Sequence, residues 1–399
     1  MQVDAEDILE ISGHFGALED PRSHINRKHL LGDVMVICVS AVLSGCDGPI
    51  AIGEWAQAKD AWLREHLELP HGIPSHDTIS RILIALKPAA FQACFREWVG
   101  AMVTAKEPAV AVAGGAVPDA APTAAAPRHI AIDGKTLRRS HDRRRGLGPL
   151  HLVSAWAVEC GVSLGQLATE EKSNEITAIP QLLEQIELQG SVVTIDAAGC
   201  QKEIAAKIVQ GGGDYCLALK GNQGNLHAAV AEWIEARMSE DFVGVEVQTL
   251  ECQEKKRHGR IDHYTYHQFP APRELPSRGE WKKLTTIGVA IRLSTCGEQE
   301  TYDVRYYLNS MPLEVQLFAK SVRGHWAIEN TLHWCLDVTF REDDSRVRER
   351  NLTNNLAWLK RFAISLLKQV PDKRSVAMRR RHCGWNENYL AQVLFGSAS

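Results

Sequence analysis

Apolar residues recur at helical spacing through the first hundred residues of the chain, and Gly and Pro signals separate the apolar segments. This pattern predicts a small helical domain over residues 1–107. Its helices are expected at residues 30–44, 52–67, 75–86 and 91–103. Residues 108–127 then have the small-residue and proline composition of a flexible connector, which predicts a domain boundary there and a second domain at residues 128–399.

After the connector, strand patterns alternate with helical patterns. Strands are expected at residues 130–133, 152–158, 162–169, 192–196 and 215–219, and helices at residues 176–186, 202–209 and 226–238. Three strands and a helix, followed by strand, helix, strand and helix, is the order of a mixed sheet in which parallel strands join an antiparallel meander. Ribonuclease-H-like folds are built in this order, so we predict an α/β domain of that class.

Residues from about 240 to 312 interrupt this order with further strand patterns. Strands are expected at residues 242–250, 260–269, 284–294 and 302–309. The helical pattern resumes at Leu313. We therefore predict a β-rich insertion that precedes the last helices of the sheet domain.

Two of the predicted strands end in an aspartate that a small residue follows at once: Asp133 before Gly134, and Asp196 before Ala197. Carboxylates at the ends of two buried strands can meet at one edge of a sheet and hold a hard cation through oxygen ligands. This reading predicts a metal site. Asp-Gly at a strand end is also an ordinary turn sequence, and that alternative stays open for each aspartate taken alone.

A third carboxylate is expected on a helix that packs back against the sheet. At a spacing of four, His325, Glu329, His333 and Asp337 share one helical face. Glu329 is the best candidate for the third ligand. Two histidines and a carboxylate also suit zinc, although these residues are spread more widely than the compact zinc motif on one helix.

Positive charge is concentrated in a few segments of a chain whose net charge is −4. Residues 346–381 contain eleven Lys or Arg against two acids, and residues 135–145 contain six against one. Such clusters suit phosphate neutralisation or a solvated face. In the first domain, Ser75 stands where it would cap a helix that carries His76 and Arg81, and this helix could enter a DNA groove or pack as a core helix.

Several function classes are excluded by composition. The N-terminal residues are acidic where a secretory signal would be basic, and the longest apolar run, residues 34–46, is too short to cross a bilayer. The ten cysteines are scattered singly, without zinc or disulfide spacing. A cytoplasmic protein with free thiols and no membrane contact is expected.

Six motifs in order resemble the DDE transposases of bacterial insertion sequences, in the branch of the H-repeat-associated proteins. The resemblance covers nearly the whole chain. The motifs are Asp20-Pro21-Arg22, the segments 72–78 and 131–135, Thr194-Ile195-Asp196-Ala197, Leu219-Lys220-Gly221-Asn222-Gln223 and the segment 323–346. A related branch has a tyrosine and an arginine before its glutamate and lysines after it. Here Val322, His325 and Leu336 stand at three of those positions, so this chain does not have the extended signature of that branch.

The resemblance implies a ribonuclease-H-like catalytic domain in which Asp133, Asp196 and Glu329 bind two Mg²⁺ or Mn²⁺ ions. It implies DNA cleavage at the inverted-repeat ends of a mobile element, followed by joining to target DNA. A homodimer in a synaptic complex and a location on nucleoid DNA are expected as well. Candidate DNA contacts are Lys135, Arg138, Arg139, Lys220, Asn222, Arg323 and His325 near the acids, with Ser75, His76 and Arg81 in the first domain.

Two other functions are compatible with the sequence. The first is an element-derived protein that has lost its chemistry and only binds DNA. The second is a nuclease that acts on RNA. The presence of all three acids favours the transposase.

Overall fold

The computed structural model describes residues 15, 18–23, 25, 27–96, 127–169, 174–256 and 259–395. Within these ranges no helix has the length and apolar character needed to cross a membrane. The predicted connector at residues 108–127 lies outside the described residues except for its last position, and the predicted helix 91–103 is described only as far as residue 96.

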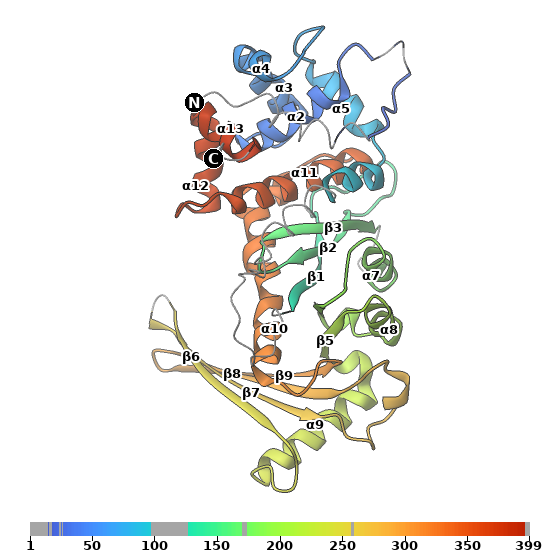
Figure 1. Cartoon of the computed structure of the whole chain (residues 1–399), viewed down its shortest axis with the longest axis vertical. Helices are drawn as coiled ribbons and strands as arrows, with labels where there is room; N and C mark the ends of the chain where they lie inside the picture. The colour runs from blue at the N-terminus through green and yellow to red at the C-terminus, as the bar shows by residue number, and fades with distance from the viewer. Residues whose placement is uncertain are drawn as a thin grey trace, which may run out of the picture.

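Nine strands form one sheet in the described part of the chain, in the order β3-β2-β1-β4-β5-β9-β8-β7-β6 (Figure 1). The strands are β1 (Arg128–Thr136), β2 (His151–Ala157), β3 (Val162–Thr169), β4 (Ser191–Ile195), β5 (Asp214–Leu219), β6 (Gln248–Lys255), β7 (Ile261–Pro270), β8 (Thr286–Cys296) and β9 (Gln299–Asn309). The pairs β1–β4 and β4–β5 are parallel, and the other neighbours are antiparallel. The fold is a mixed α/β structure with a mostly antiparallel sheet.

The predicted insertion extends the central sheet. Strand β9 pairs antiparallel with β5, so that Leu217 lies opposite Leu308 and the four inserted strands continue the same sheet. The first inserted strand begins later than predicted, at Gln248. The residues before it form a turn in which Asp241 and Phe242 have φ angles of 50° and 61°, a left-handed conformation that a strand does not adopt.

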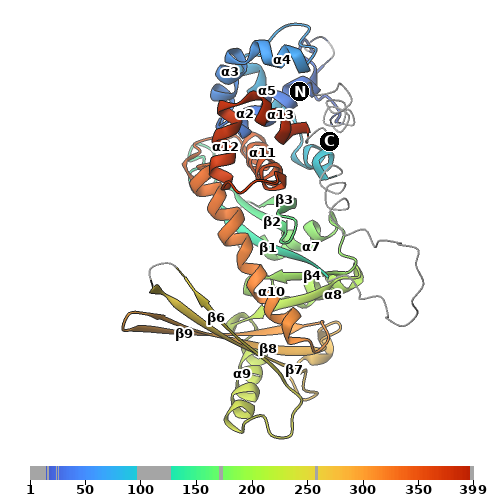
Figure 2. The ribbon, with the colours of Figure 1, turned by 60° about the vertical axis from the view of Figure 1, so that its left-hand side comes forward.

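Helices cover both faces of the sheet. On one face, α7 (Glu175–Leu183), α8 (Lys202–Gln210) and α9 (Gly224–Ser239) share a core with the central strands. On the other face, α10 (Val315–Ala327) crosses the strands diagonally (Figure 2). Phe318 of α10 lies 5.4 Å from the Tyr307 ring and fits over Gly288, where a Cβ atom would stand 2.5 Å from that phenyl ring.

The first and last helices of the chain pack together at one end of the molecule (Figures 1 and 2). Asn355 donates hydrogen bonds to the carbonyls of Leu83 and Leu86, and the rings of Phe95 and Phe362 lie 4.1 Å apart. The described part of the predicted first domain therefore shares its core with the C-terminal helices. These helices are α2 (Leu31–Leu43), α3 (Pro49–Ala58), α4 (Asp60–His66) and α5 (His76–Ala85), with α11 (Arg350–Gln369), α12 (Val376–Trp385) and α13 (Glu387–Phe395).

Two further predicted boundaries were wrong. Residues 52–67 form two helices, because the backbone leaves helical geometry at Lys59 between α3 and α4. Strand β1 does not end at Asp133 but continues to Thr136, because it stays paired with β2, where Lys135 lies opposite Leu152.

Candidate active site

The two predicted aspartates lie side by side. Ile132 of β1 is paired with Ile195 of β4 in parallel register, and the two aspartates are the next residues along the chain. Neighbouring strands are about 4.8 Å apart, so the two carboxylates emerge at the same edge of the parallel pair. Asp196 accepts backbone N–H bonds from Ala198 and Gly199, which fixes its carboxylate at the end of β4.

Glu329 comes from the segment that continues α10. It lines a cavity together with Asp196 and His325. Burial raises the pKa of Asp133 to about 7, against a hydrogen bond from the Gly134 N–H, and the negative charges of Asp196, Glu329 and Glu175 raise it further. The charges of the other two predicted acids thus act on Asp133. Among the described residues, no group of three or more His, Cys, Asp and Glu side chains is already close enough together to hold a metal ion.

The segment carrying Glu329 is not a regular α-helix as predicted. After α10 ends at Ala327, Ile328–His333 and Cys335–Thr339 are π-helical. Because a π-helix holds more residues per turn, the spacing of four does not keep these side chains in one straight row. Ile328, Leu332 and Cys335 are buried, so one side of the segment is apolar and packs into the core. Single π-helical turns occur frequently at functional sites.

The histidines of this segment are uncharged polar groups. Burial lowers the pKa of His325 to about 4, and its Nδ1 lies 3.1 Å from the Thr194 hydroxyl. Burial also lowers the pKa of His333 to about 3, and its Nδ1 is 3.4 Å from an Asp133 carboxylate oxygen. His325, predicted as a DNA contact, is therefore not a cation that would attract phosphate at neutral pH.

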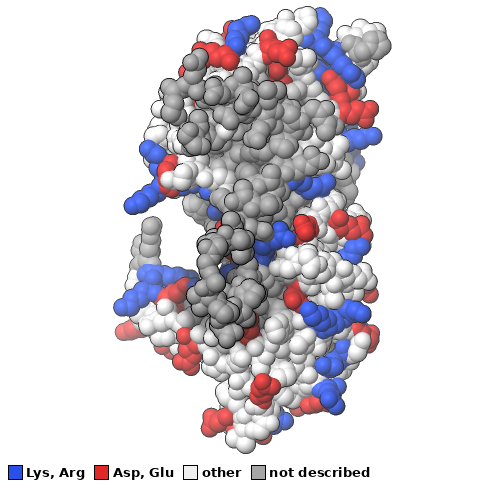
Figure 3. All heavy atoms as spheres, viewed as in Figure 1, with Lys and Arg blue, Asp and Glu red and all other residues white. Residues whose placement is uncertain are grey.

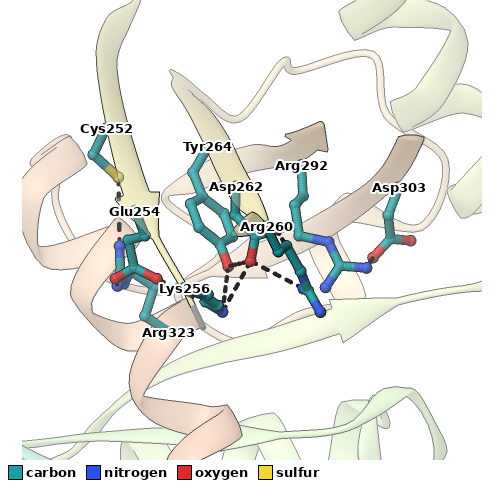
Figure 4. Close-up of polar contacts among 9 residues, drawn as sticks. All are labelled: Cys252, Glu254, Lys256, Arg260, Asp262, Tyr264, Arg292, Asp303 and Arg323. Carbon is teal, nitrogen blue, oxygen red and sulfur yellow. Dashed lines mark hydrogen bonds and ion pairs between the residues drawn. The ribbon is translucent and has the colours of Figure 1, made fainter. Parts of the chain in front are cut away.

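Three other predicted DNA contacts are bound within the protein. Lys135 is 8% exposed and pairs with two aspartates. The amide of Asn222 donates to the Ala197 carbonyl, 2.6 Å away, so it holds the turn after Asp196. Arg323 pairs with Glu254 and lies over the Tyr264 ring (Figure 4).

The other predicted contacts remain at the surface. Lys220 is exposed and lines the same cavity as Glu329. Arg138 and Arg139 make ion pairs of 3.2 and 3.4 Å with Asp343 and Asp344, but their side chains are mostly exposed. At the helical end of the molecule, His76 and Arg81 are exposed residues of α5. Ser75 is also exposed and caps this helix as predicted.

Sequence reasoning missed a basic and aromatic groove between α10 and the inserted strands. Trp326 lies there with the guanidinium of Arg305 4.6 Å from its ring centre and that of Arg292 5.3 Å away. Arg305 and Trp326 also line the cavity of Asp196 and Glu329, so the groove and the cavity adjoin. The only sequence signal was strand alternation, which puts Arg305 and Tyr307 of β9 on one face.

A buried carboxylate fixes the tip of the insertion beside this groove (Figure 4). The Asp262 side chain is fully buried, with Arg260 Nε at 2.8 Å and Lys256 Nζ at 2.9 Å. Burial alone would raise the pKa of Asp262, but hydrogen bonds from Arg260, Ser294 and Lys256 hold it well below its usual value. The ionised form of Asp262 therefore stabilises the folded state.

Replacing Asp262 with alanine is expected to lower the free energy of unfolding by about 1–3 kcal/mol at pH 7. Because the folded-state pKa is depressed, the contribution is complete above the usual aspartate pKa and is lost as the pH falls below about 4. Urea unfolding at pH 7 and pH 3 measures this, and the gap between wild type and variant should narrow at pH 3. Asp60→Ala, which breaks an exposed pair with Arg64, is the control and should cost less than about 0.5 kcal/mol.

The matches to known proteins cover almost the whole chain. Residues 124–367 match the family described as Transposase DDE domain, and residues 12–99 match the family described as DDE_Tnp_1-associated. The chain is 35% identical to the "H repeat-associated putative transposase YhhI" of Escherichia coli strain K12, over 98% of this chain and 99% of that protein. It is also 35% identical to the "Putative transposase YncI" of Escherichia coli O157:H7, over 97% and 95% of the two chains.

A shorter relative carries a different description. The "Inactive transposase YbfQ" of Escherichia coli strain K12 is 27% identical over 19% of this chain and 92% of its own length. The full-length matches, together with the family model over the sheet and its helices, are sufficient to assign the chain. It belongs to the DDE transposase family, among the H-repeat-associated transposases.

Proposed function

We propose that the protein cleaves DNA at the ends of its own mobile element and joins those ends to target DNA. One observation carries the proposal: Asp133 and Asp196 come directly after the paired residues Ile132 and Ile195 of two parallel strands, and the charges of Asp196 and Glu329 reach Asp133. The strand order β3-β2-β1-β4-β5, with helices on both faces, supports a ribonuclease-H-like catalytic domain. In this proposal the other four strands are an insertion into that domain.

The residues fit a pair of divalent cations by their chemistry. All three are carboxylates, which are the hard oxygen donors that Mg²⁺ and Mn²⁺ prefer. Burial and, to a smaller extent, the charges of Asp196 and Glu329 raise the pKa of Asp133, and a bound cation would offset both effects. Asp133, Asp196 and Glu329 would hold these ions. Bound there, the ions would activate the attacking oxygen and stabilise the leaving oxygen of a phosphodiester.

The chain's own residues would orient this site. The two N–H bonds to Asp196 and the contact from His333 to Asp133 restrict the directions of both carboxylates. Because His333 is neutral, it adds no positive charge to compete with a cation. Water would attack the scissile phosphorus and release a 3′ hydroxyl, and that hydroxyl would attack the target strand.

Positive groups on both sides of the acids would hold the DNA. Lys220 and Arg305 line the cavity, and Arg138 and Arg139 lie farther along the chain from Asp133. In Figure 3, Lys and Arg side chains border the indentation at the left edge, between the helical end and the inserted strands. We propose that α5 contacts the inverted repeat and that two chains hold two ends as a dimer.

Replacing Arg305 with glutamine is expected to weaken DNA binding about three- to tenfold at low salt. It should also reduce the slope of log affinity against log salt concentration by about one, because one phosphate contact is lost. Fluorescence anisotropy with a labelled duplex measures both quantities. The matched control is Arg237→Gln: Arg237 also stacks on a tryptophan, 5.5 Å from the Trp233 ring, but it belongs to α9 on the other face of the sheet. An equal effect of both variants would contradict the assignment.

The proposed function is tested by incubating purified protein with Mg²⁺ and an end-labelled duplex that carries the flanking inverted repeat. We expect a metal-dependent cut at the element end, absent in EDTA. Binding without any cut in Mg²⁺ or Mn²⁺ would instead support an inactive DNA-binding protein. One relative is named an inactive transposase. Preferential cleavage of an RNA duplex would favour the RNA nuclease.

A further inference from the structure

Lys135 occupies an unusual position for a residue in a DNA-binding site. It lies in β1 two residues after Asp133, on the same side of the strand, and only 8% of it is exposed. Its Nζ atom is 2.6 Å from an Asp337 carboxylate oxygen and 3.1 Å from an Asp343 carboxylate oxygen. Two carboxylates therefore already satisfy the charge of this ammonium group.

Both partners of Lys135 follow Glu329 along the chain. Asp337 belongs to the second π-helical turn, and Asp343 belongs to the short 3₁₀ helix Glu342–Asp344 that follows. The segment contacts β1 at two positions: the His333 ring contacts the Asp133 carboxylate, and the Asp337 carboxylate pairs with Lys135. The strand and the π-helical segment therefore contact each other both at Asp133 and two residues farther along β1.

The π-helical backbone makes such contacts necessary. It is a rare geometry that the local sequence does not impose, so tertiary contacts must decide how far the segment is wound and where Glu329 points. Before Glu329, α10 is anchored by the packing of Phe318 and by the ion pair of Lys320 with Glu159. After Glu329, the segment is anchored to β1 by the contact of His333 with Asp133 and by the ion pair of the buried Lys135 with Asp337.

We propose that Lys135 is a positioning residue that holds the glutamate-bearing segment against β1 and thereby sets the spacing between Glu329 and Asp133. This role rests on the proposed function, because it matters only if the two acids share metal ions. It also replaces the predicted role of Lys135 as a phosphate contact. Lys135 then acts on metal affinity through Asp337 and leaves DNA affinity to other residues.

The test compares Lys135→Met, Asp337→Asn and the double variant with the full-length wild type. The first readout is the Mn²⁺ concentration that gives half of the maximal rise in melting temperature, and the second is DNA affinity and its salt slope in EDTA. We expect Lys135→Met and Asp337→Asn each to raise the Mn²⁺ midpoint at least about tenfold, and the double variant to raise it no further than the stronger single change. DNA affinity should stay within about twofold.

The matched control is Lys320→Met, which removes a lysine anchor from the regular part of the same helix. It should leave the Mn²⁺ midpoint within about twofold of wild type. If Lys135→Met does not fold, Asp337→Asn tests the proposal alone, because it keeps the lysine and its second partner Asp343.

Three outcomes would overturn the positioning role. An unchanged Mn²⁺ midpoint in Lys135→Met and Asp337→Asn excludes it, as does an equal rise in Lys320→Met. A fall of about one in the DNA salt slope of Lys135→Met, with an unchanged midpoint, would restore the phosphate contact. If the wild type neither gains stability with Mn²⁺ nor cuts DNA, the proposed function itself is rejected. If the wild type cuts DNA and Lys135→Met has the wild-type Mn²⁺ midpoint, only the positioning role is rejected.

Discussion

Replacing Asp133 with asparagine is expected to reduce Mg²⁺-dependent cleavage at the element end by at least about a thousandfold. The amide keeps the shape of the side chain but removes the negative charge that would hold both ions. DNA affinity measured in EDTA should remain within about twofold of wild type, because no DNA phosphate contact is assigned to Asp133. The measurement is cleavage of an end-labelled duplex under single-turnover conditions.

The same substitution should raise the stability of the metal-free protein, although it abolishes cleavage. Burial, with the nearby carboxylates, raises the pKa of Asp133 to about 7, whereas an unfolded chain has an aspartate pKa of about 3.9. The folded state therefore holds this proton more tightly, and the stability of the metal-free protein falls as the pH rises from about 4 to 7. Asparagine does not ionise, so it avoids the free-energy cost of a buried charged carboxylate. Above pH 7 the variant should therefore be more stable than wild type by up to about 4 kcal/mol.

Urea unfolding in EDTA at pH 5 and pH 8 measures this difference. Asp133→Asn should gain stability over wild type at pH 8 and lose most of that gain at pH 5. Asp196→Asn and Glu329→Gln should lose cleavage as Asp133→Asn does. Glu187→Gln, at an exposed position before the start of β4, is the control and should cut like wild type. Normal cleavage by any of the three site variants would exclude that acid from the site.

The second large effect is expected from Gly324→Ala in α10. A Cβ atom at Gly324 would stand 2.2 Å from Nδ1 and 2.4 Å from Cε1 of His129. His129 cannot easily move aside, because it is buried in β1 and its Nε2 lies 2.8 Å from the Thr194 hydroxyl. Alanine would improve the helix propensity by about 1 kcal/mol, but overpacking costs typically 1–3 kcal/mol. We expect a net loss of up to about 2 kcal/mol as α10 is pushed away from β1.

This displacement should reach the chemistry, because Glu329 follows Gly324 by little more than one helical turn. A shift of about 1 Å can cost about a hundredfold in rate, so cleavage should fall by about ten- to a hundredfold. Urea unfolding and the cleavage assay measure the two effects.

Gly32→Ala is the matched control for this substitution. Gly32 lies in α2, and an added Cβ there would meet nothing within 4 Å, so alanine should raise stability and leave cleavage unchanged. If Gly324→Ala behaved like Gly32→Ala, the close contact between α10 and β1 would not hold the site together.

The strands that lead to the acids were predictable because their pattern is local. An apolar run before Asp133 or Asp196 indicates a buried strand, and the carboxylate comes directly after the run. The parallel pairing of β1 with β4 then follows from the order of elements. The inserted strands were also predicted as elements, since their alternation is local.

The environment of the acids could not be predicted, because it depends on long-range packing. The pairing of β5 with β9 and the core shared by the first and last helices join segments far apart in sequence. A lysine two residues after an acid has the same local sequence whether it faces a phosphate or, as Lys135 does, two carboxylates. The π-helical turn at Glu329 has no sequence signature, so the predicted spacing of four was wrong in its geometry.

Cleavage of a duplex in which sulfur replaces the non-bridging oxygens of the scissile phosphate tests the metal site most directly. Mg²⁺ binds oxygen far better than sulfur, whereas Mn²⁺ accepts both. If ions held by Asp133, Asp196 and Glu329 contact this phosphate, wild-type protein should fail to cut the sulfur duplex in Mg²⁺ and should cut it in Mn²⁺. Cleavage of the sulfur duplex in Mg²⁺ at the rate of the oxygen duplex would contradict the account.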